Sequence, residues 1–230
     1  MIALIALAAF VWSFAVFLLA AMFLAEVIAD FGADRADNEE PRGEAGRIAI
    51  VIPAHDEEHG IAACLANARA ELRPGDRIVV VADNCADGTA LAARAAGAET
   101  IERSDPARRG KGYALQFGVD HLRADPPDIV IFTDADCRFA PGAAIRLARG
   151  AAALRRPVQA LYLMNPPPEP SPKDRVSAFA WLLMNRVRMN GLFRLCGATR
   201  LTGAGMAFQW PLIADEPLAS GEIVEDLALS

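Results

Sequence analysis

The chain has 230 residues, 53% of them hydrophobic, and its mean hydropathy of +0.23 is high for a soluble domain. This length suffices for one sizeable hydrophobic core, and the excess of apolar residues indicates that part of the chain sits in lipid. The formal net charge of −6 argues against a general nucleic-acid-binding surface, so any phosphate ligand must be met by local cations or by a metal ion.

The N-terminal stretch is long and uncharged: residues 2–25 carry no charged side chain, and the first is Glu26. A bilayer is crossed by ~20 apolar residues, whereas a secretory signal has a basic start and an apolar core of only ~7–15 residues. We therefore predict a transmembrane helix over 1–29, with a buried helix of a soluble core as the alternative. Basic residues follow this helix and none precedes it, which places the C-terminal bulk in the cytoplasm; they are Arg35, Arg42 and Arg47.

After a polar, charged stretch over 30–46, predicted to be a linker, the pattern alternates between short β-branched runs and helical segments. The runs predict strands over 48–53, 77–83, 98–101, 158–163 and from Ile129. The segments between them predict helices over 57–71, 86–96, 112–123 and 141–155. Such alternation is typical of an α/β fold with a mostly parallel central sheet and helices on both faces. We assign this domain to 47–230 and expect that its C-terminal end is missing from this chain.

A Pro-rich connector over 166–172 leads into a long predicted helix over 173–195. Apolar residues such as Val176 and Phe179 recur at helical spacing, and several arginines flank them. Two interpretations stay open: a basic amphipathic helix at an anionic membrane surface, or a helix packed on the core with one solvated face.

The four cysteines predict neither a disulfide framework nor a zinc site. They are scattered, without a CxxC pair or a histidine at zinc-ligand spacing: Cys64, Cys85, Cys137 and Cys196. We interpret them as reduced, packed thiols of a cytosolic domain. The histidines His55, His59 and His121 are equally scattered, and we interpret them as bystanders.

Residues 129–136 read Ile-Val-Ile-Phe-Thr-Asp-Ala-Asp, a buried strand that ends in two carboxylates. Ligands of open α/β sheets bind at the carboxyl ends of the strands. Asp134 and Asp136 therefore predict an oxygen-only site for Mg²⁺ or Mn²⁺, although taken alone they are more typical of an Asp-rich turn.

Four further motifs carry candidate chemistry. They are Ile50–Glu58 (Ile-Val-Ile-Pro-Ala-His-Asp-Glu-Glu), Val79–Thr89 (Val-Val-Val-Ala-Asp-Asn-Cys-Ala-Asp-Gly-Thr), Arg108–Leu115 (Arg-Arg-Gly-Lys-Gly-Tyr-Ala-Leu) and Thr202–Phe208 (Thr-Gly-Ala-Gly-Met-Ala-Phe), followed by Glu225-Asp226. Singly, each is typical of ordinary turns, solvated basic loops or helix-terminal acids. Together they predict acids from several strand ends converging at one edge of the sheet.

Each residue type suits a part of one reaction. Asp83 can accept from a base N–H or a ribose hydroxyl, and Arg109 and Lys111 beside a helix N-terminus suit a diphosphate. A metal at the aspartate pair would bridge the same diphosphate. Asp226 suits a general base. Gly203 and Gly205 would let a backbone approach a substrate closely.

In this order the motifs resemble the family 2 glycosyltransferases, over about Ile48–Ser230. The resemblance implies a GT-A fold and an inverting, metal-dependent transfer from a nucleotide sugar. It implies Asp226 as catalytic base, Asp134 and Asp136 as metal ligands, and substrate contacts at Pro53, Glu57, Asp83, Lys111, Asp134, Gly203, Gly205 and Glu225. Asp136 is implied as the more direct ligand.

Some positions depart from that family. Asp56 stands where asparagine is usual, and Ala82 where many members carry an aspartate. A Gln-x-x-Arg-Trp motif, which in processive synthases helps to hold the acceptor glycan, is absent from the sequence, so processivity stays open.

We expect sugar transfer from a nucleotide-diphosphate donor, with uridine as the default base, to a hydroxyl of a glycan or lipid. The expected partners are that donor, that acceptor and a membrane, without nucleic acid; the expected location is an inner or plasma membrane with the catalytic domain in the cytoplasm. The alternatives are a nucleotide-sugar-binding subunit without turnover and a nucleotidyltransferase. A nicotinamide-binding fold is disfavoured because no GxGxxG follows the first strand.

Overall fold

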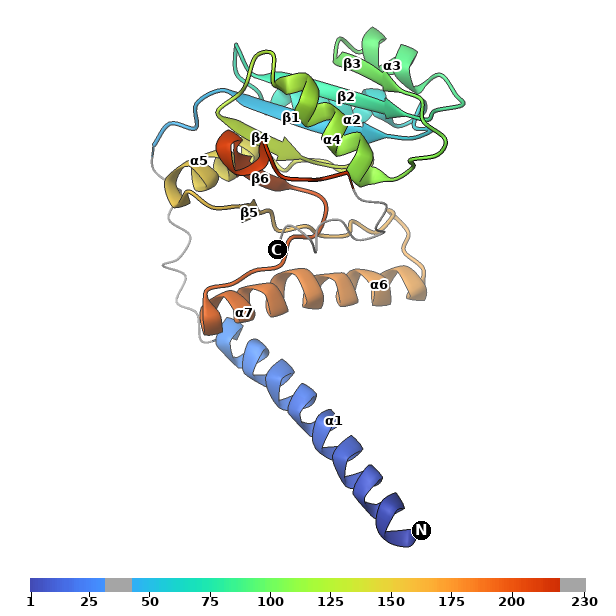
Figure 1. Ribbon diagram of the computed structural model, residues 1–230, viewed down its shortest axis with the longest axis vertical. Helices are drawn as coiled ribbons and strands as arrows, with labels where there is room; N and C mark the ends of the chain where they lie inside the picture. The colour runs from blue at the N-terminus through green and yellow to red at the C-terminus, as the bar shows by residue number, and fades with distance from the viewer. Residues whose placement is uncertain (32–42, 220–230) are drawn as a thin grey trace. The chain divides into compact units, whose positions relative to one another are not determined.

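The computed structural model describes residues 1–31 and 43–219. Most of the predicted linker, together with Glu225 and Asp226, lies outside these described residues. The described residues form two compact units, each treated by itself below: one of 1–31 with Leu161–Arg200, and one of 43–160 with 201–219. The first unit is helical and the second carries the sheet (Figure 1).

The helical unit contains α1 (Ile2–Phe31), α6 (Pro172–Leu182), the π-helical segment η2 (Leu183–Arg188) and α7 (Met189–Cys196). The predicted helices over 1–29 and 173–195 are confirmed, with α1 extending to Phe31. The predicted connector ends at Ser171, which caps α6: the Ser171 hydroxyl accepts from the Asp174 amide, and Asp174 accepts from the Ser171 amide at 2.9 Å.

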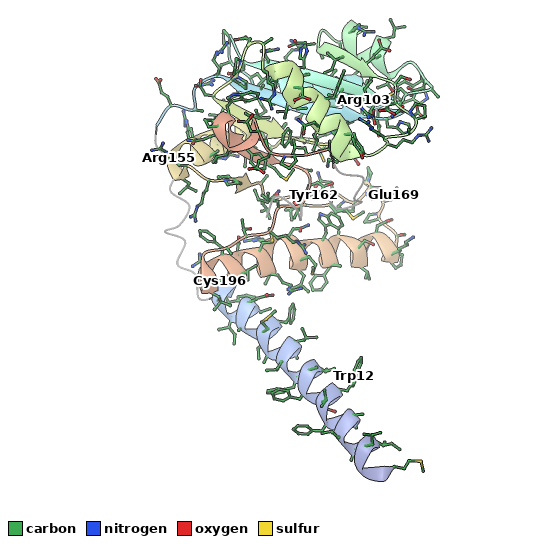
Figure 2. All side chains as sticks on the ribbon, viewed as in Figure 1. Trp12, Arg103, Arg155, Tyr162, Glu169 and Cys196 are labelled. Carbon is green, nitrogen blue, oxygen red and sulfur yellow. The ribbon has the colours of Figure 1, made fainter. Side chains whose placement is uncertain are left out.

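Within the described residues, α1 is the helix that is long and apolar enough to cross a bilayer, over Leu4–Phe31 with a hydropathy of 2.5. Most of its large apolar side chains are exposed, and 74% of Trp12 is accessible to solvent. Figure 2 shows Trp12 pointing away from the helix axis. This exposure is consistent with a membrane tether, although an N-terminal signal sequence passes the same length and composition test.

The C-terminal part of α1 packs against α7 and η2. Glu26 is only 3% exposed and accepts from Arg188 Nε at 2.5 Å, and the Arg188 guanidinium lies 5.6 Å from the ring centroid of Phe23. Gly191 packs directly against the α1 backbone, since a Cβ there would overlap the Glu26 carbonyl oxygen. The close approach therefore depends on the missing side chain.

The sheet unit contains a six-stranded sheet of order β3-β2-β1-β4-β6-β5. Its strands are β1 (Ile48–Ala54), β2 (Arg77–Asp83), β3 (Glu99–Arg103), β4 (Ile129–Phe132), β5 (Val158–Gln159) and β6 (Met206–Gln209). The pairs β1–β2, β1–β4 and β2–β3 are parallel, whereas β6 runs antiparallel to β4 and β5. The predicted α/β fold with a mostly parallel sheet is confirmed.

Both faces of the sheet are buried, which is why the central strands read as continuous apolar runs. Alternate residues serve opposite faces: Ile48, Ile50 and Ile52 pack on one side, and Ala49 and Val51 on the other. The first face is covered by α2 (Ile61–Ala70), α3 (Thr89–Ala95) and α5 (Ala143–Leu154). The second is covered by α4 (Lys111–Leu122) and the short α8 (Trp210–Ile213).

Some predicted boundaries are wrong. Helix α2 begins at Ile61 rather than Glu57, and α3 at Thr89 rather than Ala86, because the intervening residues form interlocking loops. The predicted strand over 158–163 pairs only at Val158–Gln159, and β6 was not predicted.

Gly118 lies in α4, directly over the sheet. A Cβ at this position would lie 2.7 Å from Val51 Cγ1 and 3.1 Å from Val81 Cγ2, and both valines are fully buried. We expect Gly118→Ala to destabilise the chain by about 1–3 kcal/mol through overpacking. Thermal unfolding of the detergent-solubilised chain measures this effect. Gly60→Ala is the control, because its new Cβ would meet only Glu57 Oε2 at 3.6 Å; equal destabilisation of both variants would contradict the packing argument.

Asp76 ties the start of β1 to the loop before β2. Its side chain is 2% exposed and accepts from the Ile48 and Arg73 amides, each at 2.9 Å, and from Arg73 Nε at 3.0 Å. Burial acts to raise the pKa of Asp76, but these hydrogen bonds hold the pKa below its usual value. The stability that the carboxylate contributes is therefore present above about pH 3.9 and is lost as the pH falls through the lower folded pKa.

We expect Asp76→Asn to lower the free energy of unfolding by about 1–3 kcal/mol at neutral pH. The difference from the parent chain should shrink in acid, because both chains then carry an uncharged side chain there. Unfolding curves at neutral and acidic pH test this, with the surface residue Asp120 changed to Asn as control. A difference that does not change with pH would contradict the assignment to the carboxylate charge.

Candidate active site

A pocket of about 420 Å³ opens at the carboxyl ends of β1, β2 and β4, beside the N-terminus of α4. Its lining comprises Pro53, Ala54, His55, Glu57, Asp83, Asn84, Arg109, Gly110, Lys111, Ala114, Asp134, Ala135 and Asp136. The parallel registers explain this convergence, because β1 is the central partner of both β2 and β4 and all three strands end at one edge. The structure thus brings together six of the predicted site residues: Pro53, Glu57, Asp83, Lys111, Asp134 and Asp136.

Asp83, the last residue of β2, is 7% exposed and faces this pocket. Its Oδ1 accepts from Arg103 at 2.6 Å and from Asn84 at 3.0 Å. The Arg103 guanidinium lies 5.3 Å from the ring centroid of Tyr113, which helps to orient it. Both of these hydrogen bonds use Oδ1. Among the described residues, Oδ2 of Asp83 is therefore the better placed of the two oxygens to accept a hydrogen bond from a ligand.

Lys111 opens α4 after Gly110, whose φ of 127° suits only glycine. Its ammonium forms an ion pair with Asp134 and donates to the Gly203 carbonyl at 2.7 Å. Arg109 is exposed at the same helix start. Two cations beside a helix N-terminus make this end of the pocket suited to a phosphate group.

Asp134 and Asp136 follow β4 and line the same pocket. Together with Cys137 they offer ligand atoms that all lie within 4.8 Å of one another. The two carboxylates, one half-buried and one exposed, fit a hard divalent cation. Because Asp134 already forms an ion pair with Lys111, Asp136 is the carboxylate that can bind such an ion more readily.

Gly203 and Gly205 precede β6 and both have left-handed backbones, with φ of 78° and 69°. Neither lines the pocket, and Gly203 is joined to it through Lys111. Gly205 has a packing role: its amide donates to the Phe132 carbonyl at 2.8 Å, and a Cβ there would lie 2.6 Å from that of Ala160. Glu225 and Asp226 lie outside the described residues.

Interlocked loops hold Glu57 at the pocket. The buried Thr89 hydroxyl accepts from the Glu57 amide at 2.7 Å and donates to Asp87 at 2.5 Å, while Asp87 also accepts from the Glu58 amide at 3.0 Å. The Thr89 hydroxyl is the main cause of the lowered pKa of Asp87. Glu57 and Glu58, which the predicted helix over 57–71 included, are therefore loop residues, and these loop contacts explain why α2 and α3 begin later than predicted.

Sequence reasoning missed some residues of this site. His55, interpreted as a bystander, lines the pocket, and its position immediately after β1 was the available signal. Arg103 gave no signal, because it contacts Asp83 from the next strand. The four cysteines, all of them described, form no disulfide with one another, as predicted, but Cys196 is exposed rather than packed. Burial raises the pKa of Cys64 to about 11, with smaller effects from Cys137 and Asp136.

Comparison with known proteins decides the family. Residues 49–203 match the model of glycosyl transferase family 2. The chain belongs to this family. The match includes the pocket and ends before β6, and the predicted resemblance is confirmed.

A low-salt glycan biosynthesis hexosyltransferase, Agl6 of Haloferax volcanii, is 35% identical over 99 residues, which cover 41% of this chain and 22% of that protein. Among solved structures, the mannosyltransferase PcManGT of Pyrobaculum calidifontis, in complex with GDP-Man and Mn²⁺, superposes with a TM-score of 0.56 at 22% identity, over 87% of this chain and 56% of the other. Glucosyl-3-phosphoglycerate synthase of Mycobacterium tuberculosis, in complex with UDP, gives a TM-score of 0.55 at 22% identity, over 80% and 64%. This chain therefore spans less than two thirds of each relative, and the two superpositions establish the fold.

Proposed function

We propose that this chain is a membrane-tethered hexosyltransferase that moves a sugar from a nucleotide-diphosphate donor to a hydroxyl of a glycan or lipid at the cytoplasmic face. The observation that carries the proposal is the single pocket in which Asp83, Lys111 and Asp136 meet. Family membership and the nucleotide-containing structures of relatives support it. We further propose the organisation inferred above: a tether over 1–29, a linker over 30–46 and a transferase domain over 47–230.

The donor is proposed to bind along the strand ends. Pro53, Glu57 and Asp83 hold the nucleoside, with the buried carboxylate of Asp83 accepting from the base or ribose. Lys111 and Arg109 at the start of α4 neutralise the diphosphate. The base is proposed to be uracil, although relatives of the same fold are solved with either GDP-Man or UDP.

Asp136, with Asp134, is proposed to hold Mn²⁺ or Mg²⁺. Such an ion, when bound, supplies positive charge to the diphosphate leaving group. The oxygen donors fit that role, and Mn²⁺ accompanies GDP-Man in the PcManGT structure. Cys137 is the softer neighbour in this cluster and is not required by a hard ion.

The chemical step is proposed to invert the anomeric carbon. Asp226 removes the proton of the acceptor hydroxyl. The acceptor oxygen forms a bond to the anomeric carbon as the bond to the diphosphate oxygen breaks, and the electron pair leaves with the nucleoside diphosphate. The loop that contains Gly203 and Gly205, together with Glu225, is proposed to lie on the acceptor side.

The decisive experiment gives a panel of radiolabelled nucleotide sugars to membranes that contain the complete gene product, with and without Mn²⁺. We expect one donor to yield labelled glycan or lipid and free nucleoside diphosphate, dependent on the ion. Donor binding without turnover would instead support a binding subunit, and release of pyrophosphate a nucleotidyltransferase.

A further inference from the structure

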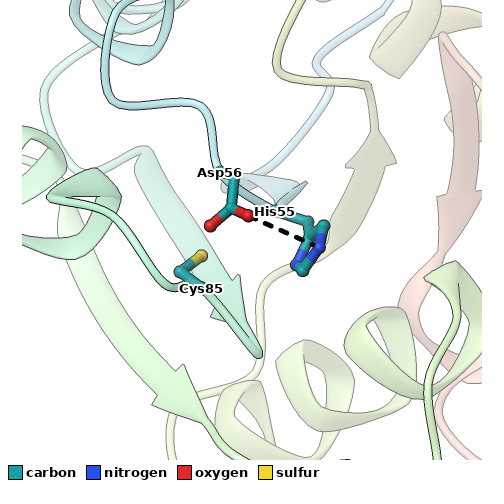
Figure 3. A group of neighbouring side chains, drawn as sticks. All are labelled: His55, Asp56 and Cys85. Carbon is teal, nitrogen blue, oxygen red and sulfur yellow. Dashed lines mark ion pairs between the residues drawn. The ribbon is translucent and has the colours of Figure 1, made fainter.

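A second group of metal-ligating side chains lies beside the donor pocket, separate from the aspartate pair. His55 and Asp56 follow β1, and Cys85 lies just beyond β2 (Figure 3). A ring nitrogen of His55, a carboxylate oxygen of Asp56 and Cys85 Sγ all lie within 4.8 Å of one another. These three donors are nitrogen, oxygen and sulfur, a set that suits Zn²⁺ and differs from an oxygen-only site.

The backbone creates this meeting point. Strands β1 and β2 are parallel, with Ala54 opposite Ala82, so the residues that follow them emerge together. Asp56 and Asn84 then take left-handed conformations, with φ of 56° and 51°, which turn the two loops sharply. Such positions favour Asn and Asp among non-glycine residues.

The imidazole of His55 is fixed in a form that can bind a cation. Its Nδ1 lies 2.7 Å from the backbone oxygen of Asp83, and a carbonyl can only accept, so Nδ1 carries the hydrogen. The other nitrogen, Nε2, lies 3.7 Å from Asp56 Oδ2 and carries a lone pair whenever the ring is neutral. A cation between these two atoms, either a proton or a metal ion, is what makes their approach favourable. Metal-bound histidines commonly donate their second nitrogen to a backbone carbonyl in this way.

The other two donors are also oriented. Asp56 Oδ1 accepts from the Ala86 amide at 2.7 Å, which leaves Oδ2 directed toward His55. Cys85 Sγ lies 3.4 Å from the Ala54 oxygen, a weak thiol hydrogen bond that a metal would replace. The side chains of His55 and Asp56 are 60% and 43% exposed, so they can close by the small rotations that tetrahedral coordination needs.

We propose that His55, Asp56 and Cys85 form a Zn²⁺ site with three protein ligands and one open position. Binding releases the Cys85 thiol proton, and the thiolate, the carboxylate oxygen and Nε2 become the ligands. His55 also lines the pocket described above, and its group is separate from the one that contains Asp136. The inference does not depend on the proposed sugar transfer.

The first test is competition between the detergent-solubilised full chain and a chromophoric zinc chelator, with excess Mg²⁺ present to occupy the aspartate pair. We expect one Zn²⁺ per chain, bound at least ten-fold more weakly after Asp56→Asn or Cys85→Ser. Asparagine at 56 can still accept from the Ala86 amide and tolerates the left-handed backbone, so this variant preserves the loop even if the serine variant disturbs folding. His59→Gln is the matched control, since His59 also lies beside a carboxylate, 3.4 Å from Glu58, but is 96% exposed; its zinc affinity should be unchanged.

The second test identifies the thiolate. Co²⁺ in place of Zn²⁺ should give a sulfur-to-metal charge-transfer band that Cys85→Ser abolishes and Cys137→Ser preserves. A band that depends on Cys137 instead would overturn the proposal, as would zinc affinity unchanged by Asp56→Asn. In either outcome His55, Asp56 and Cys85 do not form a Zn²⁺ site.

Discussion

Asp136→Ala is expected to lower sugar transfer by about 10³-fold or more, because the diphosphate leaving group would lose the cation that stabilises its charge. Asp136 is exposed, lines the pocket and is the member of the aspartate pair less engaged by Lys111. The donor should also bind more weakly, and its binding should no longer respond to Mn²⁺. Steady-state transfer and donor binding, each measured with and without Mn²⁺, test both parts.

Asp215→Ala is the matched control for this variant. Asp215 is likewise an acid of the sheet unit, but its side chain is 92% exposed and it pairs only with Arg123 among the described residues. Both activity and the Mn²⁺ response should survive this change. Retention of Mn²⁺-dependent transfer by Asp136→Ala would show that the ion is held elsewhere.

Asp226→Ala is expected to lower turnover by about 10²–10⁴-fold while leaving donor affinity nearly unchanged, because the proposed role of Asp226 is to take a proton from the acceptor. The measurement compares kcat with the donor Kd: kcat should fall, whereas the Kd should stay the same as in the parent chain. Donor binding also reports that the variant is folded. Near-full turnover by this variant would mean that another group is the base.

Much of the fold could be predicted because burial on both faces leaves a simple pattern. Strands β1 and β2 consist almost wholly of buried apolar residues, and their predicted spans match the structure closely. Strand β6 was missed because it is only four residues long and directly follows Gly203 and Gly205, which indicated a loop. The starts of α2 and α3 were missed because Thr89 and Asp87 satisfy backbone amides of the Glu57 loop, which no local propensity reveals.

The pocket could be predicted in outline for a similar reason. Acids at the ends of parallel strands converge whatever the details of the loops, so the placement of Asp83 and Asp136 followed from the order of the motifs. The contacts that tune the site could not be predicted. Lys111 with Asp134, and Arg103 with Asp83, join segments whose side chains meet only after folding. The proposed zinc ligands could not be predicted for the same reason, since they come from two loops and have no characteristic spacing along the chain.

The contact between α1 and α7 bears on how this protein can be prepared. Removing the N-terminal helix is the usual route to a water-soluble enzyme. Here the removal would leave Arg188 without its partner Glu26, and it would expose the surface around Gly191 on which the α1 backbone packs. Residues of α6 and α7 with large apolar side chains, such as Val176 and Phe193, are exposed already. A shortened protein that begins after α1 should therefore self-associate in aqueous buffer, and purification in detergent or nanodiscs with α1 retained is the sounder course.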